Sequence, residues 1–156
     1  MEKVRSLDEI IEIKTNLKKH NKKIVFTNGC FDLIHPGHIR LFKWAESMGD
    51  ILIVGVNTDD SVKVIKGKNR PIFPLNERLE ILESIEYIDY LVPFDEETPL
   101  ELIKNIEPDF LIKGGDYNTD QVVGRDFVES YGGRVLIFPY QKKYSTSAII
   151  AKILNT

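Results

Sequence analysis

The sequence predicts a single doubly wound, Rossmann-like α/β domain with a five-stranded parallel sheet. Short apolar runs rich in Val, Ile, Phe and Tyr lie at residues 23–28, 51–56, 87–94, 109–114 and 134–139. They mostly lack polar alternation, as expected of strands that are covered on both faces. Helical stretches separate the runs, and strand–helix alternation favours a parallel sheet with helices on both faces. The length of 156 residues suits one domain, which we expect to span residues 1–156.

Apolar periodicity and end signals predict the helices, at residues 7–20, 38–48, 75–86, 99–106, 120–131 and 146–154. The first helix begins behind "SLDE" at residues 6–9, which matches a capping box. Another begins behind Thr98, with Pro99 at the first helical position. No repeat or linker interrupts the alternation, so we expect no second domain.

Composition narrows the class of protein. Apolar residues make up 42% and charged residues 29%, which is the balance of a globular protein in water. The formal net charge of −3 argues against a dedicated nucleic-acid binder. Cys30 is the single cysteine, so no internal disulfide is possible and a reducing compartment fits best. No apolar run approaches the roughly 18 residues that span a membrane, and the N-terminus lacks a signal peptide's apolar core. We therefore expect a cytoplasmic protein with neither nucleic acid nor membrane as a partner.

In a doubly wound sheet, ligands bind beyond the carboxyl ends of the strands, where the strand order reverses. That rule nominates residues 27–38, 57–70, 113–118 and 139–147.

The stretch "FTNGCFDLIHPGHIRLF" at residues 26–42 carries two of the three histidines. Gly29 lets a ligand approach the backbone closely, and the helix after it offers unpaired amides to phosphate. His35 and His38 project from a stiff turn and suit a transition state with charge on phosphoryl oxygens. On spacing alone, an ordinary turn with one capping imidazole explains the pair equally well. A zinc site is a weaker alternative, because no further ligand at suitable spacing completes it. Cys30 fits the role of a small residue in the wall of the site.

A basic run comes after the second strand, with Lys63, Lys66, Lys68 and Arg70 and no acid between residues 61 and 70. It is either a solvated face or a flexible cationic arm over a triphosphate. Gly67 and Asn69 break helical regularity, which favours the arm as much as the solvated face.

Three further elements suit a ligand site, each with a simpler alternative. Arg78 in "NERLEIL" can face the site or pair with Glu77 on a helix surface. Gly114 in "KGGDY" permits close backbone approach, and Asp116 can simply cap the next element. Three hydroxyls precede the last helix, at Ser145, Thr146 and Ser147. A plain N-cap explains one, whereas three together also make a phosphate-binding corner.

"TNGCFDLIHPGH" resembles the signature of the cytidylyltransferase-like nucleotidyltransferases, which transfer a nucleotidyl group from an NTP to a phosphorylated substrate. The resemblance implies that His35 and His38 hold the triphosphate without a covalent enzyme intermediate. It also implies that a lysine of the basic run reaches the phosphates, with Lys66 as the first candidate and Lys63 as the second. Arg78 is expected to point into the site. The expected nucleotide-binding set comprises Thr27, Asn28, Gly29, Cys30, Phe31, Gly37, Asn57, Lys63, Gly114, Asp116, Ser145, Thr146 and Ser147.

Within the family, "VNTDDSVKVIKGKNRPI", "PDFLIKGGDY" and "STSAII" resemble the adenylyltransferase half of the bacterial heptose kinase/adenylyltransferases. The glycerol-phosphate branch usually carries an arginine shortly before the Ser-Thr run, where this chain reads "PYQKKYSTS".

That resemblance implies transfer of AMP from ATP to D-glycero-β-D-manno-heptose 1-phosphate, giving ADP-heptose and pyrophosphate. It further implies Mg²⁺ with ATP but no protein metal site, a separate upstream heptose kinase because no kinase half is recognised, and a homodimer. The alternatives are a cytidylyltransferase for glycerol 3-phosphate or another alcohol phosphate, and a non-catalytic nucleotide-binding regulator.

Overall fold

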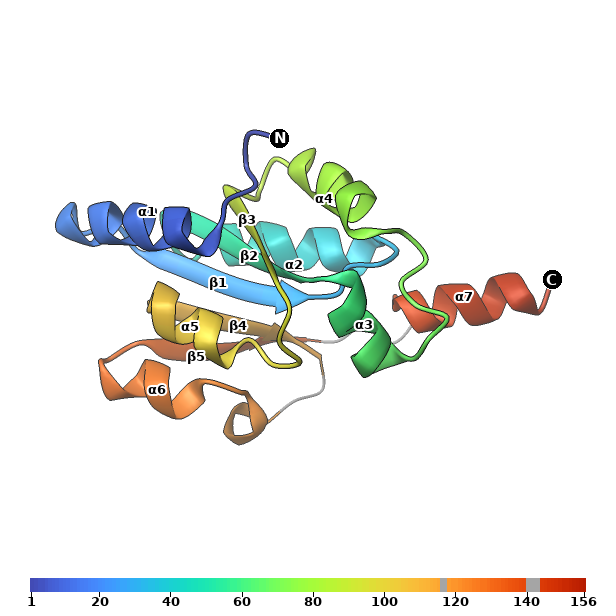
Figure 1. Cartoon of the computed structure of the whole chain (residues 1–156). Coiled ribbons are helices and arrows are strands. Elements are labelled where there is room, and N and C mark those ends of the chain that lie inside the picture. The colour runs from blue at the N-terminus through green and yellow to red at the C-terminus, as the bar shows by residue number, and fades with distance from the viewer. Residues whose placement is uncertain (116–117, 140–143) are drawn as a thin grey trace.

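Five strands form one parallel sheet in the computed structural model, which describes residues 1–115, 118–139 and 144–156 (Figure 1). The strands are β1 (Ile24–Gly29), β2 (Ile51–Asn57), β3 (Tyr90–Phe94), β4 (Phe110–Gly114) and β5 (Arg134–Phe138). Their order across the sheet is β3-β2-β1-β4-β5, and each adjacent pair is parallel. The predicted fold class is confirmed. The order reverses between β1 and β4, which is therefore the switch point.

The helices are α1 (Leu7–Lys19), α2 (Pro36–Glu46), α3 (Asp59–Lys66), α4 (Leu75–Glu83), α5 (Leu100–Ile106), α6 (Arg125–Ser130) and α7 (Thr146–Leu154), with a 3₁₀ turn, η1 (Thr119–Gln121). The predicted capping box at the start of α1 is confirmed. The Ser6 hydroxyl accepts from the amide of Glu9 at 3.2 Å, and the Glu9 carboxylate accepts from the amide of Ser6 at 2.7 Å. This exchange satisfies two donors that a helix end would leave unpaired.

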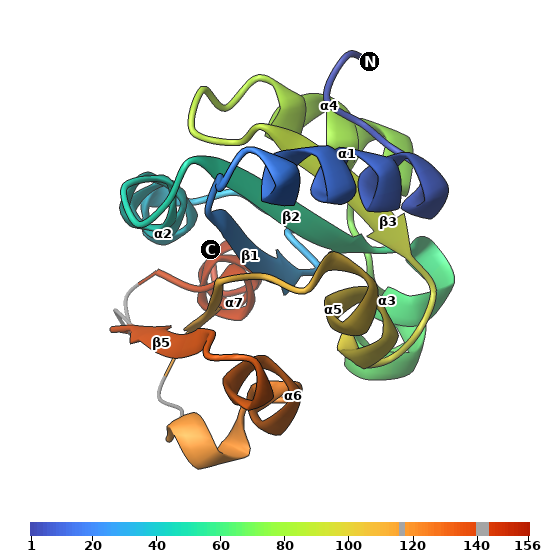
Figure 2. The same ribbon diagram turned by 90° about the vertical axis from the view of Figure 1, so that its left-hand side faces the viewer.

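Two apolar clusters hold the helices on opposite faces of the sheet. On one face, Ile10 of α1, Ile103 of α5 and Val128 of α6 pack against the strands. On the other face, Phe42 of α2 and Leu82 of α4 do the same. Figure 2 shows α2 and α5 on opposite sides of β1 and β2. Both faces of the sheet are thus covered, which leaves the carboxyl ends of the strands for a ligand.

The helix predicted at residues 120–131 is wrong as one continuous element. It is divided into η1 and α6 at Gly124, whose φ is +89°. A β-carbon there would also lie 2.9 Å from Cδ1 of Ile103. The backbone therefore turns at a position that only glycine fills without strain.

The basic run is also different from the prediction, because its first half is helical. α3 begins after Thr58, carries Asp59 and Asp60 in its first turn, and ends with Lys63 and Lys66 in its last turn. That distribution complements the helix dipole at both ends. Other boundaries also differ. α2 spans residues 36–46 instead of 38–48, and β3 begins at residue 90 instead of 87. Pro99 caps α5 instead of opening it, and α4 ends at residue 83 instead of 86.

The last helix, α7, projects away from the sheet (Figure 1). Its N-terminus is held by Ser145, whose hydroxyl accepts from the amide of Ala148 at 3.0 Å. The Thr146 hydroxyl donates to the carbonyl of Leu33 at 3.0 Å, which fixes α7 to the loop before α2. At its far end Ile153 is 61% and Leu154 78% exposed. Within the described residues, no helix has both the length and the apolar character needed to cross a membrane.

Candidate active site

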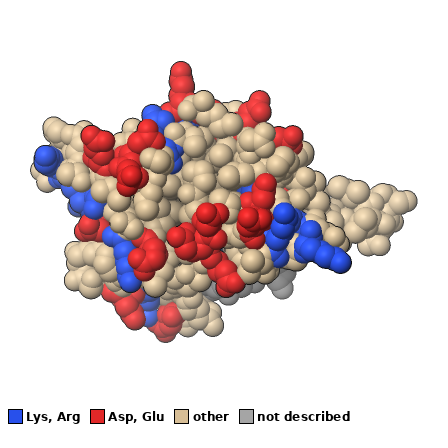
Figure 3. Space-filling model, in the orientation of Figure 1, with Lys and Arg blue, Asp and Glu red and all other residues tan. Residues whose placement is uncertain are grey.

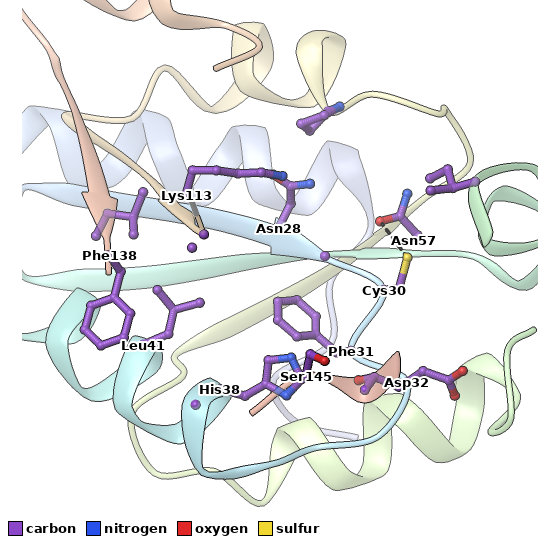
Figure 4. A pocket seen from close by; sticks show the side chains of 18 of the residues that line it. Asn28, Cys30, Phe31, Asp32, His38, Leu41, Asn57, Lys113, Phe138 and Ser145 are labelled. Atoms are coloured by element: carbon purple, nitrogen blue, oxygen red, sulfur yellow. Dashed lines mark hydrogen bonds between the residues drawn. The ribbon is translucent and has the colours of Figure 1, made fainter. Parts of the chain in front are cut away.

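A cavity of about 660 Å³ lies at the carboxyl ends of the strands, at the switch point between β1 and β4. Its volume falls in the range of small-molecule sites. The walls come from every segment that comes after a strand: Asn28 to Asp32, His35, Gly37, His38, Leu41, Asn57, Ile65, Lys66, Arg70, Glu97 to Pro99, Leu111 to Gly115, Gln121 to Val123, Phe138, Pro139 and Tyr144 to Ser147. Figure 4 shows side chains from these segments converging on it.

The two histidines meet at the N-terminus of α2. Their rings are stacked, with centroids 3.7 Å apart, and the amide of His35 donates to Nδ1 of His38 at 3.3 Å. Because Nδ1 accepts, the ring proton of neutral His38 lies on Nε2, where it can be donated to a ligand. A β-carbon on Gly37 would lie 2.9 Å from Cε1 of His35 and 3.1 Å from Cβ of Tyr144. The turn therefore closes this tightly because residue 37 is glycine.

Both imidazoles are neutral at physiological pH. Burial lowers the pKa of His35, and burial together with the neighbouring His35 lowers the pKa of His38 to about 3. The edge of Phe31 packs on His38 at a centroid distance of 5.4 Å. In the described part of the chain, Nδ1 of His35 and the hydroxyl of Thr27 are buried without a hydrogen-bond partner. The pair can therefore donate hydrogen bonds to phosphate without first losing a counter-ion.

Asp32 clamps the segment that lies after α3. Its buried carboxylate accepts from Nε of Arg70 at 2.7 Å and from the amides of Ile72 and Phe73 at 2.8 and 3.0 Å. Burial acts to raise the pKa of Asp32, but the two amides and Arg70 outweigh it and lower that pKa. Arg70, expected in a cationic arm, is instead fixed against the cavity wall. The Asp32 carboxylate is therefore occupied by hydrogen bonds within the protein.

Arg78 is fully buried and does not line the cavity, which corrects the expectation that it points into the site. Its Nη1 donates to the carbonyls of Cys30 and Asn57, each at 2.7 Å, and its Nε donates to the carbonyl of Phe73 at 3.0 Å. Nη2 pairs with the carboxylate of Asp59 at 2.8 Å. One guanidinium thus connects the ends of β1 and β2, the start of α3 and the segment before α4.

The lysines of α3 differ in position. Lys66 lines the cavity, whereas Lys63 is half-exposed outside it, with its Nζ 3.9 Å from the Asp60 carboxylate. Figure 3 shows basic side chains gathered over α3 beside the projecting α7, next to acidic ones. Of the two lysines, Lys66 lines the cavity and Lys63 does not.

The cavity includes side chains that the sequence-based site set omitted. Lys113 is the residue directly before Gly114, the last residue of β4, and it lines the cavity (Figure 4). Tyr144 stands near the histidine turn, with its ring centroid 6.4 Å from that of His35 and the guanidinium of Arg40 over its face at 5.1 Å. Glu97 to Pro99 come after β3, so the rule that ligands bind after the strands could have found them.

Thirteen of the predicted site residues line the cavity: Asn28, Gly29, Cys30, Phe31, His35, Gly37, His38, Asn57, Lys66, Gly114, Ser145, Thr146 and Ser147. Thr27, Lys63 and Arg78 do not. Asp116 lies outside the described residues, as do residues 140–143, where the departure from the glycerol-phosphate branch falls.

A protein-held metal does not fit the residues that the structure describes. Among them, no three His, Cys, Asp or Glu side chains converge in a way that could hold an ion. Asp32 is engaged by Arg70 and two amides. Cys30 belongs to no such group among the described residues, and burial raises the pKa of its thiol.

A neutral histidine pair at a helix N-terminus, set at the switch point of a parallel sheet, characterises an α/β nucleotidyltransferase. The chain belongs to the cytidylyltransferase-like family, whose model matches residues 26–152.

Curated relatives include two proteins named bifunctional protein HldE. That of Citrifermentans bemidjiense is 48% identical over 154 residues, which are 99% of this chain and 32% of the relative. That of Geobacter sulfurreducens is 49% identical over 153 residues, or 98% of this chain and 31% of the relative. The chain therefore spans about a third of the length of these relatives.

Two solved structures share the fold. The lipopolysaccharide core biosynthesis protein from Thermoplasma volcanium superposes with a TM-score of 0.63 at 27% identity, over 80% of this chain and 99% of that one. The pantoate–β-alanine ligase from Francisella tularensis gives a TM-score of 0.62 at 17% identity, over 100% of this chain and 80% of that one. The second likeness supports the fold alone.

Proposed function

We propose that the chain transfers AMP from ATP to D-glycero-β-D-manno-heptose 1-phosphate, forming ADP-heptose and pyrophosphate. The observation that carries the nucleotidyl transfer is the stacked His35–His38 pair at the N-terminus of α2, inside the switch-point cavity. The acceptor rests on the resemblance to the adenylyltransferase half of the heptose kinase/adenylyltransferases. The HldE relatives, bifunctional by name, support it, as does the neighbour titled a lipopolysaccharide core biosynthesis protein.

The chemistry is a direct displacement at the α-phosphorus of ATP. An anionic oxygen of the sugar phosphate forms the new P–O bond, and the bond to the β-phosphate bridging oxygen breaks, so that pyrophosphate leaves with the electron pair. The attacking oxygen carries no proton at neutral pH, so no general base is required. Alignment of attacker and α-phosphate can then supply on the order of 7–11 kcal/mol of the barrier.

The cavity residues divide this work. We assign His35, His38 and the first amides of α2 to the phosphate oxygens, where neutral donors stabilise charge as it develops. Lys66 is assigned to the triphosphate, and the hydroxyls of Ser145 and Ser147 at the start of α7 to the nucleotide. Arg78 acts as a positioning residue, because it holds the carbonyls of Cys30, Asn57 and Phe73 in place.

The remaining partners are part of the same proposal. Mg²⁺ enters bound to ATP, which suits a cavity whose Asp32 carboxylate is committed to Arg70 and two amides. A sugar kinase must supply the phosphorylated acceptor, and we propose that it is a separate protein. We also propose a homodimer, which multi-angle light scattering of the purified chain tests.

A pyrophosphate-release assay over a grid of nucleotides and acceptors tests the function. We expect turnover with ATP and heptose 1-phosphate and little with either alone. Preference for CTP with glycerol 3-phosphate would establish the cytidylyltransferase alternative. Nucleotide binding without turnover in any cell of the grid would establish the regulator. The HldE relatives favour neither alternative.

A further inference from the structure

Lys113 places a charged group where its strand is otherwise apolar. β4 reads Phe-Leu-Ile-Lys-Gly, with Leu111 2% and Ile112 0% exposed. Lys113 itself is half-buried and lines the cavity. Burial lowers the pKa of its ammonium, the Cys30 thiol acts in the opposite direction, and Lys66 adds to the lowering. Removing an ammonium from water is costly, and such groups in clefts are candidates for function.

The sheet opens at this lysine. β1 and β4 pair only at Val25–Phe110 and Phe26–Leu111, whereas β1 and β2 pair over six positions from Ile24 to Gly29. Beyond Leu111 the two central strands are therefore no longer paired, and Asn28 and Lys113 stand on the two sides of the opening. Figure 4 shows the Lys113 side chain running along the sheet edge towards Asn28, across the cavity from His38.

Three groups that can bind phosphate, the histidine pair and two lysines, thus line one cavity from different elements. The histidine pair comes from α2, Lys66 comes from the end of α3, and Lys113 comes from the end of β4. Lys66 and Lys113 both line this cavity, and the charge of Lys66 acts to lower the pKa of Lys113. Two cations facing one cavity repel each other, and an anion between them removes the repulsion.

We propose that Lys113 is a substrate-binding residue whose ammonium contacts phosphoryl oxygens of the bound substrates at the opening between β1 and β4. The proposal rests on the proposed nucleotidyl transfer, which brings a triphosphate and a sugar phosphate into this cavity. The oxygens belong either to ATP or to the acceptor, and the same chemistry recognises both.

The test compares Lys113→Met, which keeps the stem and removes the charge, with Lys104→Met. Lys104 is exposed on α5 and pairs with Glu101, so the same substitution there changes only the surface. Calorimetry measures the dissociation constants for inorganic tripolyphosphate and for heptose 1-phosphate, and thermal melting checks folding. If Lys113→Met does not melt cooperatively, Lys113→Gln takes its place.

We expect Lys113→Met to melt like the wild type and to bind at least one of the two anions about 10–100-fold more weakly, the scale of one charge-assisted hydrogen bond. Weaker binding of tripolyphosphate assigns the contact to ATP, and weaker binding of heptose 1-phosphate assigns it to the acceptor. Lys104→Met should bind both anions like the wild type.

Wild-type affinity of Lys113→Met for every anion that the wild type binds would overturn the proposal. A wild type that binds tripolyphosphate but not heptose 1-phosphate would refute the proposed acceptor alone, and the tripolyphosphate measurement would then decide the role of Lys113.

Discussion

Replacing Arg78 by methionine separates a structural role of this arginine from a catalytic one. Methionine keeps much of the buried volume but removes the donors to the carbonyls of Cys30, Asn57 and Phe73. Each buried acceptor left unpaired costs about 1–3 kcal/mol, and partial entry of water favours the lower end. We therefore expect Arg78→Met to lower the free energy of unfolding by about 3–5 kcal/mol.

In a chain of this length, about 1 kcal/mol shifts the melting temperature by roughly 2–4 °C, so we expect a decrease of about 6–20 °C. Differential scanning calorimetry measures it. The matched control is Arg125→Met on α6, where the guanidinium pairs with Asp120 and Glu129 at the surface. Exposed pairs contribute about 0–1 kcal/mol, so the control should melt almost like the wild type.

An unchanged melting temperature for Arg78→Met, together with a loss of turnover of a hundredfold or more, would refute this reasoning. The guanidinium would then contact substrate, as the family resemblance implies.

Three further predictions concern the cavity. His38→Ala should lower kcat by about 10²–10³ with little change in melting temperature, since one transition-state donor is lost. Folding lowers the pKa of His38 from 6.5 to about 3. Between pH 6.5 and 3 the imidazole is therefore protonated in the unfolded chain but not in the folded one, so acid favours unfolding. Urea titrations should therefore show that the wild type loses stability relative to His38→Gln as pH falls from 6.5 towards 3. Lys66→Ala should lower kcat, and Mg-ATP should protect residues 61–70 from limited proteolysis, since an anion fixes the end of α3.

Each of these has a clear contrary result. Near wild-type turnover of His38→Ala would make that histidine structural. A pH-independent difference between wild type and His38→Gln would mean that His38 titrates normally in the folded protein. Unchanged cleavage with ATP, together with unchanged kcat for Lys66→Ala, would mean that α3 is an ordinary solvated helix. Lys63→Ala, on the same helix but outside the cavity, is the control variant for Lys66→Ala.

The strands and the histidine turn could be predicted because their signals are local. Each strand is a short apolar run, and "HPGH" combines a helix start with two ring donors inside four residues. The helical character of α3 was also present in the sequence. Asp59 and Asp60 precede Lys63 and Lys66, which is the charge order that a helix dipole favours. The choice between a cationic arm and a solvated face weighed only the basic residues and the helix-breaking Gly67 and Asn69, and left these two aspartates out.

The role of Arg78 could not be predicted from local pattern. Its three carbonyl acceptors belong to residues 30, 57 and 73, and no periodicity states that these meet. The Asp32–Arg70 pair joins residues 38 positions apart in the same way. Lys113 is an intermediate case, since its position at a strand end was visible but the early end of β1–β4 pairing was not.

Transfer of AMP from ATP onto a sugar phosphate in this cavity is the central proposal. The most direct measurement follows the purified chain with Mg-ATP and D-glycero-β-D-manno-heptose 1-phosphate, quantifying ADP-heptose by mass spectrometry and pyrophosphate enzymatically. We expect equal amounts of both products from the wild type and formation about 10²–10³ slower from His38→Ala. Pyrophosphate without ADP-heptose would contradict the transfer, and ADP-heptose formed equally fast by His38→Ala would contradict the catalytic role of the histidine pair.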